Sequence, residues 1–471
     1  MLKKFMLRMY NQRFEDISVR VIYFFNTIDT YFLAAGIISL WLFSSWYGLR
    51  FSQLTFMLVC AGGVYALFKL ADFYPLFVIC SPVYLYFLLK NSVISFPQTG
   101  ILLLINLCIF TVIQFIFMSI PESVVARDMS IGFRKIWNSV FTIAPTTVSM
   151  SMSVFYSSLF ALVLLVKPMP DNTYGLLFWI SMGISAGVAC WGKPRSFISV
   201  FHQPEHKEKI CEKLVILNID GCRLDRFYEA ELPFMTSLLQ ESSYFPNGLY
   251  TVYRALTNPA FASILTGTIP SVHGVKTNNL SRQIRVEGLP DIVPTKLYGS
   301  MHVKHFSKNT WDTQIVSLPE HGSNKCDDVM FDMLVKDLAQ HDGTRLYVAD
   351  ISETDFLGHA YGSQSRQYLD ALKRADARIE KFMAWLRMQP FVNDMVVIIC
   401  SDHGIVQIDH SYLLFDAEKR VPFMVVGKGI KKNNKLMFEA SIMDIAPTVS
   451  YLLGIRYPSS SKGRVLTEIF E

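Results

Sequence analysis

The sequence predicts an α-helical transmembrane domain of about six spans, followed by an α/β domain with a mostly parallel central sheet. Charge separates the two parts. Residues 1–200 contain 14 Lys or Arg and 7 Asp or Glu, whereas residues 201–471 contain 30 and 32, together with all ten histidines. The overall charged fraction of 18% is below the about 25% typical of soluble domains. We therefore predict a transmembrane domain over 1–200, a linker over 201–213 and a second domain over 214–471.

Uncharged windows predict the spans, because a helix needs about 17–25 apolar residues to cross the hydrocarbon core of a bilayer. The windows are residues 30–49, 51–68, 73–89, 91–121, 136–166 and 172–192. With six spans and the N-terminus inside, 14 Lys or Arg lie on the inner side and 3 in the outer loops. This bias places the second domain in the cytoplasm, and an odd number of spans would place it outside. No cleavable signal peptide is expected.

Composition also bears on partners and on the redox compartment. The formal net charge of +5 combines an excess of 7 positive charges before residue 201 with an excess of 2 negative charges after it. The positive excess therefore reports orientation in a lipid bilayer, and no nucleic acid polymer is expected as a partner. The 8 cysteines show no metal-binding spacing, which is typical of free thiols in a reducing compartment.

Short apolar runs alternate with helical patterns after residue 213. The runs cover residues 214–219, 346–349, 395–400 and 423–426, and the clearest helical patterns cover 363–388 and 442–453. Strands that are apolar on both faces and separated by helices are typical of a mostly parallel sheet covered on each side. Ligands of such sheets bind at the carboxyl ends of the strands.

Side chains that can bind a metal lie at those strand ends. Asp220 directly follows the first apolar run, and Asp402 and His403 come shortly after the third. Asp355 and His359 are four residues apart, which places both on one face of a helical turn. The candidates are Asp220, Asp355, His359, Asp402, His403 and His410. Carboxylates mixed with imidazoles suit a zinc-like ion better than calcium or magnesium, which prefer oxygen ligands.

Thr257 has two interpretations. It precedes a predicted helix with Pro259 near the first turn, so it could be an ordinary N-cap. Its hydroxyl would also lie at the positive end of that helix, where a phosphate binds readily, and there a threonine could act as a nucleophile.

Taken together, these motifs resemble the alkaline phosphatase superfamily, and within it the nucleotide pyrophosphatase/phosphodiesterase type. The resemblance covers about residues 213–455. It rests on separate motifs in the family's order, at residues 220–221, 257–275, 355–362, 401–404, 421–429 and 444–448.

The resemblance implies an alkaline-phosphatase-like fold and two divalent ions, zinc or alternatively manganese. It assigns Asp220, Thr257, Asp402 and His403 to one ion, and Asp355, His359 and His410 to the other. Asn278 would donate to the phosphoryl oxygens. Thr257 would attack phosphorus, and water would then hydrolyse the threonyl-phosphate. The implied substrate is a phosphodiester or pyrophosphate small molecule or a lipid head group. The oligomeric state stays open.

Two further functions remain open, and a third is disfavoured. Phosphoethanolamine and phosphoglycerol transferases of this superfamily use a lipid donor but usually carry glutamate at the position of Asp220. The chain could also be a transporter or assembly platform with a phosphatase-like binding module. A sulfatase would need Cys or Ser in place of Thr257 and arginine in place of Phe261.

Overall fold

The computed structural model describes residues 28–71, 85–90, 94–113, 195–198, 203–205, 208–278, 282–340, 342–406, 410 and 415–471, together with single positions between 156 and 187. The chain divides into two units, and the second contains Pro194–Glu471. Each unit is described by itself.

The first unit contains three long described helices, which overlap the first, second and fourth of the predicted windows. They are α3 (Ile28–Tyr47), α4 (Phe51–Ala71) and α6 (Phe96–Ile113). Among the described residues, no helix combines the length and the apolar character that crossing a membrane requires. The windows 73–89, 136–166 and 172–192 lie largely outside the described residues, so the six-span domain stays a prediction.

The second unit is built on a central sheet. The described strands are β1 (Lys213–Ile219), β2 (Ser243–Tyr244), β3 (Leu249–Tyr250), β4 (Thr295–Gly299), β5 (Asp312–Ile315), β6 (Leu346–Ile351), β7 (Met395–Cys400), β8 (Arg420–Val421), β9 (Phe423–Gly427) and β10 (Asn434–Lys435). Within the described residues they form an eight-stranded sheet in the order β10-β2-β9-β7-β1-β6-β4-β5, and β3 pairs separately with β8.

The core of this sheet is parallel, as predicted. β1 pairs in parallel with both β6 and β7, and β4 continues the parallel set between β6 and β5. β9, which covers the predicted run 423–426, is antiparallel to β7.

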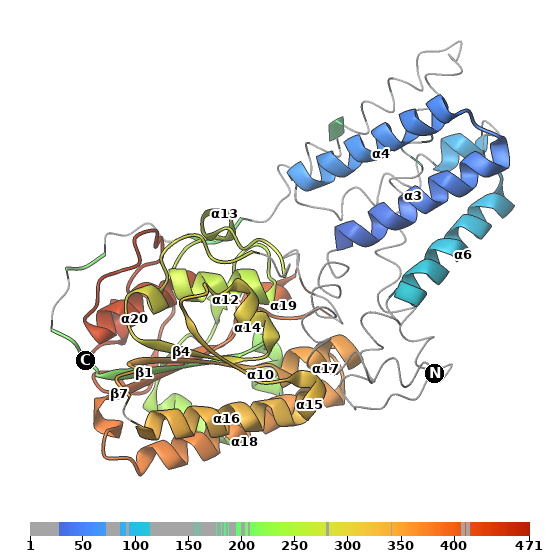
Figure 1. The fold of residues 1–471 in the computed structure, drawn as a ribbon. Helices are drawn as coiled ribbons and strands as arrows, with labels where there is room; N and C mark the ends of the chain where they lie inside the picture. The colour runs from blue at the N-terminus through green and yellow to red at the C-terminus, as the bar shows by residue number, and fades with distance from the viewer. Residues whose placement is uncertain are drawn as a thin grey trace. The chain divides into compact units, whose positions relative to one another are not determined.

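Helices cover both faces of the sheet (Figure 1). They are α10 (Leu224–Glu229), α11 (Pro233–Leu238), α12 (Thr257–Thr266), α13 (Pro270–His273), α14 (Met301–Phe306), α15 (Leu318–His321), α16 (Ser323–Gln340), α17 (Glu353–Tyr361), α18 (Arg366–Arg387), α19 (Asp416–Lys419) and α20 (Ile445–Leu453). Short 3₁₀ turns cover Leu239–Glu241, Leu289–Asp291, Val392–Asp394, Ile442–Asp444 and Thr467–Ile469.

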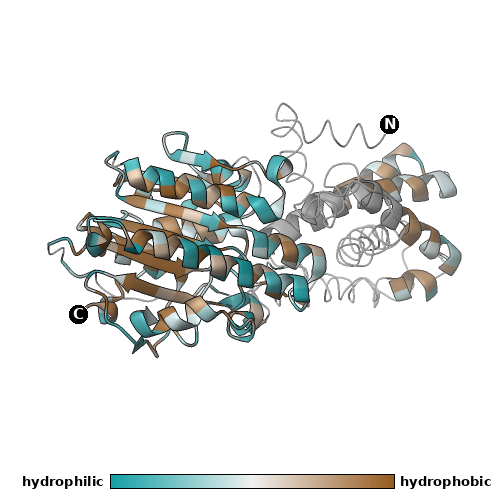
Figure 2. Cartoon of the chain, turned by 90° about the horizontal axis from the view of Figure 1, so that it is seen from below, coloured by the Kyte–Doolittle hydropathy of each residue, from teal (hydrophilic) through white to brown (hydrophobic). Residues whose placement is uncertain are grey.

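The two faces of β1 belong to two separate hydrophobic cores. Leu214 and Ile216 pack in the core that contains α12 and α20, whereas Val215 and Leu217 pack in the core that contains α16 and α18. Successive strand side chains point to opposite faces, so a strand buried on both sides must be apolar throughout. Figure 2 shows the central strands as largely hydrophobic and the covering helices as mixed in character.

The boundaries of one helix and of the linker differ from the predicted ones by a few residues. The pattern over 363–388 becomes α18, which begins at Arg366 because the Ser365 hydroxyl accepts a hydrogen bond from the Tyr368 N–H at 3.2 Å and so caps the helix. The linker also ends earlier than predicted, since Lys213 already belongs to β1. Before it, the Ile210 and Cys211 N–H groups donate to the Leu452 carbonyl at 2.9 and 3.0 Å.

A first prediction concerns Asp376, which joins α18 to the start of α11. Its carboxylate accepts hydrogen bonds from the N–H groups of Phe234 (3.1 Å) and Met235 (2.7 Å), where Leu232 cannot supply a cap. We expect Asp376→Ala to lower the free energy of unfolding of this unit by about 1–3 kcal/mol, because two buried N–H groups lose their acceptor. Chemical denaturation of the full chain measures this change.

The matched control is Asp370→Ala on the same helix. Asp370 is 44% exposed and lies 3.8 Å from Arg366, so its loss should change the unfolding free energy by less than about 0.5 kcal/mol. Equal destabilisation by both variants would contradict a capping role for Asp376.

Candidate active site

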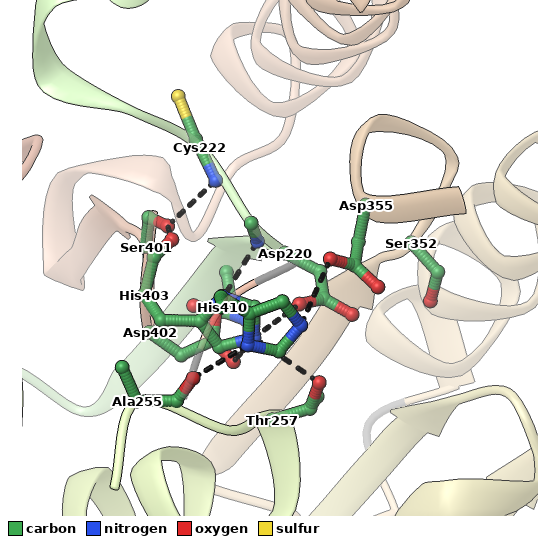
Figure 3. A network of polar contacts seen from close by, with 12 residues as sticks. Asp220, Cys222, Ala255, Thr257, Ser352, Asp355, Ser401, Asp402, His403 and His410 are labelled. Carbon is green, nitrogen blue, oxygen red and sulfur yellow. Dashed lines mark hydrogen bonds and ion pairs between the residues drawn. The ribbon is translucent and has the colours of Figure 1, made fainter. Parts of the chain in front are cut away.

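The first group of candidate residues lies where β1 and β7 end at the same edge of the sheet. Asn218 of β1 is in register with Cys400 of β7, so Asp220 and Asp402 leave their strands at one level. Asp220 is 3% exposed, and Asp402 and His403 are fully buried. His403 Nε2 lies 3.4 Å from Asp220 Oδ1 and 3.4 Å from Asp402 Oδ2. Figure 3 shows these side chains converging.

Hydrogen bonds fix the two turns against each other. The Ser401 hydroxyl donates to the His403 carbonyl at 2.9 Å and accepts from the Cys222 N–H at 3.0 Å. The Gly221 N–H donates to Asp402 Oδ1 at 3.3 Å. The backbone after β1 therefore holds the residues after β7 in place.

Thr257 joins this first group. It is the first residue of α12, and the cap position before it is Leu256, whose backbone is extended. The Thr257 hydroxyl oxygen lies 3.2 Å from His403 Nε2, and the residue is 6% exposed. The interpretation of Thr257 as an ordinary N-cap is therefore wrong, because its hydroxyl faces the Asp and His side chains.

The second group is carried by α17 and by His410. Asp355 and His359 lie one turn apart on α17, with His359 Nε2 at 3.3 Å from Asp355 Oδ2. His410 Nε2 is 3.1 Å from His359 Nε2 and 3.7 Å from Asp355 Oδ1. Two imidazole nitrogens at this distance need a proton or a cation between them, because two lone pairs repel.

The orientation of two histidines leaves their Nε2 atoms available as ligands. His410 Nδ1 lies 2.5 Å from the carbonyl oxygen of Ala255, and His403 Nδ1 lies 3.2 Å from that of Gly404. A carbonyl can only accept, so Nδ1 carries the proton in both rings and the lone pair is on Nε2. The two rings stack with centroids 3.8 Å apart, which brings the two groups side by side.

Asn278 lies beside the start of α12. Its Oδ1 accepts a hydrogen bond from the N–H of Asn258, the second residue of the helix, at 3.0 Å. The side-chain oxygen and nitrogen of Asn258 are buried without a hydrogen-bond partner. Sequence reasoning did not select Asn258, although its position directly after Thr257 was a usable signal.

The carboxylates of the site are strongly perturbed. Burial raises the pKa of Asp220 well above its usual range, and the neighbouring carboxylates of Asp402 and Asp355 raise it further. Burial, with repulsion from Asp350 and Asp355, does the same for Asp402. Burial would also raise the pKa of Asp355, but the nearby histidines, above all His359, outweigh it and lower that pKa. In the absence of a cation, Asp220 and Asp402 therefore favour their protonated, neutral form.

The side chains fit the two cations that the sequence predicts. Asp220 Oδ1, Asp355 Oδ1 and Asp402 Oδ2 are buried without hydrogen-bond partners among the described residues, and such atoms are costly unless a cation or a proton binds them. In each group the ligand atoms lie within 4.8 Å of one another. The groups are Asp220, Asp402 and His403, and Asp355, His359 and His410. Their mixed nitrogen and oxygen donors suit a zinc-like ion.

Two further side chains adjoin the site and were missed by sequence reasoning. Asp350 and His302 form a third such grouping with Asp220, and His302 Nε2 lies 3.1 Å from Asp350 Oδ2. Asn218 Nδ2 and the Ser352 hydroxyl also donate to Asp350, at 2.8 and 2.7 Å. The predicted run 346–349 stopped one residue before Asp350, and a carboxylate at the end of an apolar strand was the available signal.

Comparison with protein families identifies the second unit. Residues 214–289 and 290–455 match the family described as type I phosphodiesterase / nucleotide pyrophosphatase. The chain belongs to this family. The resemblance found in the sequence is thereby confirmed.

Individual relatives are distant. An uncharacterized pyrophosphatase/phosphodiesterase of Schizosaccharomyces pombe is 21% identical over 226 residues, which cover 43% of this chain and 46% of the relative. GPI ethanolamine phosphate transferase 1 of Mus musculus is 25% identical over 307 residues, which cover 54% of this chain and 32% of the relative. The matches thus span less than half the length of these relatives.

Solved structures show similarly low identity. Murine ectonucleotide pyrophosphatase / phosphodiesterase 5 aligns with a TM-score of 0.44 and 13% identity, covering 52% of this chain and 95% of that one. The lipoteichoic acid synthase LtaP of Listeria monocytogenes aligns with a TM-score of 0.43 and 17% identity, covering 56% and 77%.

A second prediction concerns Gly221, which has φ +67° between the two groups of ligands. A Cβ at this position would lie 2.8 Å from Asp355 Oδ1 and 2.9 Å from Ile405 Cδ1. We expect Gly221→Ala to lower metal affinity by about tenfold, because Asp355 must move. Equilibrium dialysis with zinc, followed by elemental analysis, measures this.

Gly343→Ala is the matched control. Gly343 also has a positive φ, +87°, but a Cβ there would meet nothing within 4 Å. Both substitutions place a Cβ on left-handed backbone, which destabilises the fold by about 1–2 kcal/mol. The two variants should therefore differ only in metal affinity. Normal metal binding by folded Gly221→Ala would show that the close approach to Asp355 is unimportant.

Proposed function

We propose that this chain is a membrane-bound, metal-dependent phosphodiesterase or pyrophosphatase that uses Thr257 as its nucleophile. The observation that carries the proposal is the position of the Thr257 hydroxyl, 3.2 Å from His403 Nε2, beside buried carboxylate oxygens that have no hydrogen-bond partner. Residues 214–471 would be the catalytic domain, residues 1–200 the membrane domain and residues 201–213 the linker. Family membership supports the class of reaction.

Each group of ligands would hold one divalent ion, zinc or alternatively manganese. Asp220, Asp402 and His403, with Thr257, would hold the first. Asp355, His359 and His410 would hold the second. When bound, the two ions would supply positive charge that offsets the buried carboxylates and the phosphoryl group. In the protein alone, Ala255 orients His410 through its carbonyl.

The nucleophile and its helix would do the covalent work. Thr257 Oγ1 would bond to phosphorus and release its proton to water. The opposite P–O bond would break, and the leaving oxygen would take the electron pair and a proton from solvent. Water would then attack the threonyl-phosphate, restore the Thr257 hydroxyl and release the phosphorylated product.

The start of α12 would bind the phosphoryl oxygens. A helix N-terminus presents N–H groups and a positive partial charge to an anion. Asn278 Oδ1 accepts from the Asn258 N–H in this turn, which supports a role in which its side-chain NH₂ would donate to a phosphoryl oxygen. The substrate class is a phosphodiester or pyrophosphate small molecule, or a lipid head group. We propose no nucleic acid polymer as substrate.

A third prediction tests the nucleophile and one ligand. We expect Thr257→Ala and Asp402→Asn to lower turnover at least about 1,000-fold, because the first removes the attacking oxygen and the second removes a buried negative charge from the ligand set. The measurement is hydrolysis of phosphodiesters, nucleotide sugars and phospholipid head groups with added zinc or manganese. Thr236→Ala, on the exposed face of α11, should keep full activity. Substantial turnover by Thr257→Ala would show that Thr257 is not the nucleophile.

A transferase is the second candidate, favoured by the names of two relatives. They are GPI ethanolamine phosphate transferase 1 of Mus musculus and GPI ethanolamine phosphate transferase 2 of Aspergillus fumigatus. The same site would then pass the phosphoryl group from Thr257 to an acceptor hydroxyl instead of water. If an added alcohol acceptor increases formation of the transfer product and decreases formation of the hydrolysis product, the transferase is favoured.

A fourth prediction concerns the side of the membrane. We propose a multi-pass protein whose catalytic domain faces the cytoplasm, because Lys and Arg are concentrated on that side in the six-span arrangement. A reporter fused after Glu471 should therefore fluoresce in the cytoplasm, whereas an enzyme reporter that requires the external compartment should stay inactive. The opposite pattern would indicate an odd number of spans and would favour the transferase.

A binding module without catalysis remains the third candidate. The site argues against it, because all the predicted ligands are present and converge in two groups. Elemental analysis of the purified protein separates the alternatives. A protein without bound metal and without turnover would favour a transporter or assembly platform with a phosphatase-like module.

A further inference from the structure

The N-terminus of α17, which carries Asp355 and His359, is held by a neighbouring helix. Ser352 occupies the cap position, but its hydroxyl donates to Asp350 and makes no cap hydrogen bond. Instead the carboxylate of Asp327, on α16, accepts from the N–H groups of Ser352 (3.0 Å) and Glu353 (3.2 Å). A residue from another helix thus satisfies N–H groups that the first turn of a helix leaves unpaired.

A buried arginine from a third helix completes the arrangement. Arg378 of α18 lies with Nη1 2.6 Å from Glu353 Oε2 and 3.5 Å from Asp327 Oδ2. Its Nε donates to Asp328 Oδ1 at 2.6 Å and its Nη2 to the Asn324 carbonyl at 2.5 Å. The side chain of Arg378 is 11% exposed, and those of Asp327 and Glu353 are each 2% exposed. One guanidinium therefore ties α16 and α18 to the first turn of α17.

This network acts on one half of the candidate site. Asp355 lies two residues after Glu353, and His359 lies one further turn along the same helix. Asp220, Asp402 and His403 follow strands, and none of them contacts Asp327, Glu353 or Arg378 in the interactions described above. A displacement of α17 would therefore move one group of ligands and leave the other in place.

We infer that Asp327, Glu353 and Arg378 are positioning residues that set the affinity for the ion held by Asp355, His359 and His410. This inference rests on the two-ion function proposed above. Partners that orient metal ligands from outside the coordination shell commonly change metal affinity by about 10–100-fold. The network is buried and each partner is hydrogen-bonded, so its geometry is well defined.

The test measures the affinities of both ions in the full chain. Asp327→Asn keeps the size of the side chain and removes its charge, and Arg378→Lys keeps the charge and removes the guanidinium that forms four contacts. Zinc is titrated against a competing chelator, and bound metal is measured by elemental analysis. His359→Ala and Asp402→Asn assign the two binding steps, and circular dichroism verifies folding.

We expect Asp327→Asn and Arg378→Lys to weaken binding of the ion that His359→Ala removes by about tenfold. Affinity for the other ion, which Asp402→Asn removes, should change less than about twofold. Arg387→Gln is the matched control on α18. Its guanidinium lies 3.0 Å from Glu241 and is 47% exposed, so both steps should stay as in the wild type.

Two results would overturn the inference while leaving the two-ion function intact. One is wild-type affinity for both ions in the folded variants, and the other is an equal loss at both steps, which would indicate general loosening. A wild-type protein that binds no ion would overturn the proposed function and this inference together. If Asp327→Asn does not fold, Arg378→Lys alone decides between these results.

Discussion

The burial of several carboxylates beside one another is the constraint on which the rest of this site depends. Asp220 and Asp402 are almost completely removed from water, and their ion-pair partner in the described part of the chain is His403. A neutral histidine cannot offset two buried negative charges, and burial lowers the pKa of His403 to about 4. Such an arrangement is stable only with protons or cations that supply the missing charge. A divalent cation bound by these side chains would supply that charge while leaving the carboxylates ionised.

The sheet provides the stiffness that this crowding demands. β1 is hydrogen-bonded to β6 on one side and to β7 on the other. The register pairs Asn218 with Asp350 and with Cys400, so all three strands end at the same level of the sheet. Carboxylates that repel one another would separate if they stood on loops. Here separation would break the ladder of β1, whose side chains fill two hydrophobic cores. The energy that holds the charges together comes from strand pairing and apolar burial.

The sequence allowed much of this arrangement to be predicted, for reasons that differ between residues. Asp220 and Asp402 could be found because a fully apolar strand has a clear end, and ligands gather at such ends. The direction of β9 could not, because an apolar run carries no information about its orientation. Asp350 and His302 were missed since their partnership depends on β4 and β6 lying next to each other, which no local pattern reveals. Thr257 was ambiguous because a cap and a nucleophile occupy almost the same place on a helix.

The two groups of ligands depend on different kinds of structure. Sheet register fixes the first, so its geometry is maintained by many backbone hydrogen bonds. The second combines a short helix, α17, with His410, whose ring is oriented by the carbonyl of Ala255. A helix of nine residues has little stability of its own, so tertiary contacts must fix its position. A buried arginine and two carboxylates at its first turn supply such contacts. The cost of burying these charges is offset by the ion pairs between Arg378 and the two carboxylates and by the N–H groups that Asp327 accepts from.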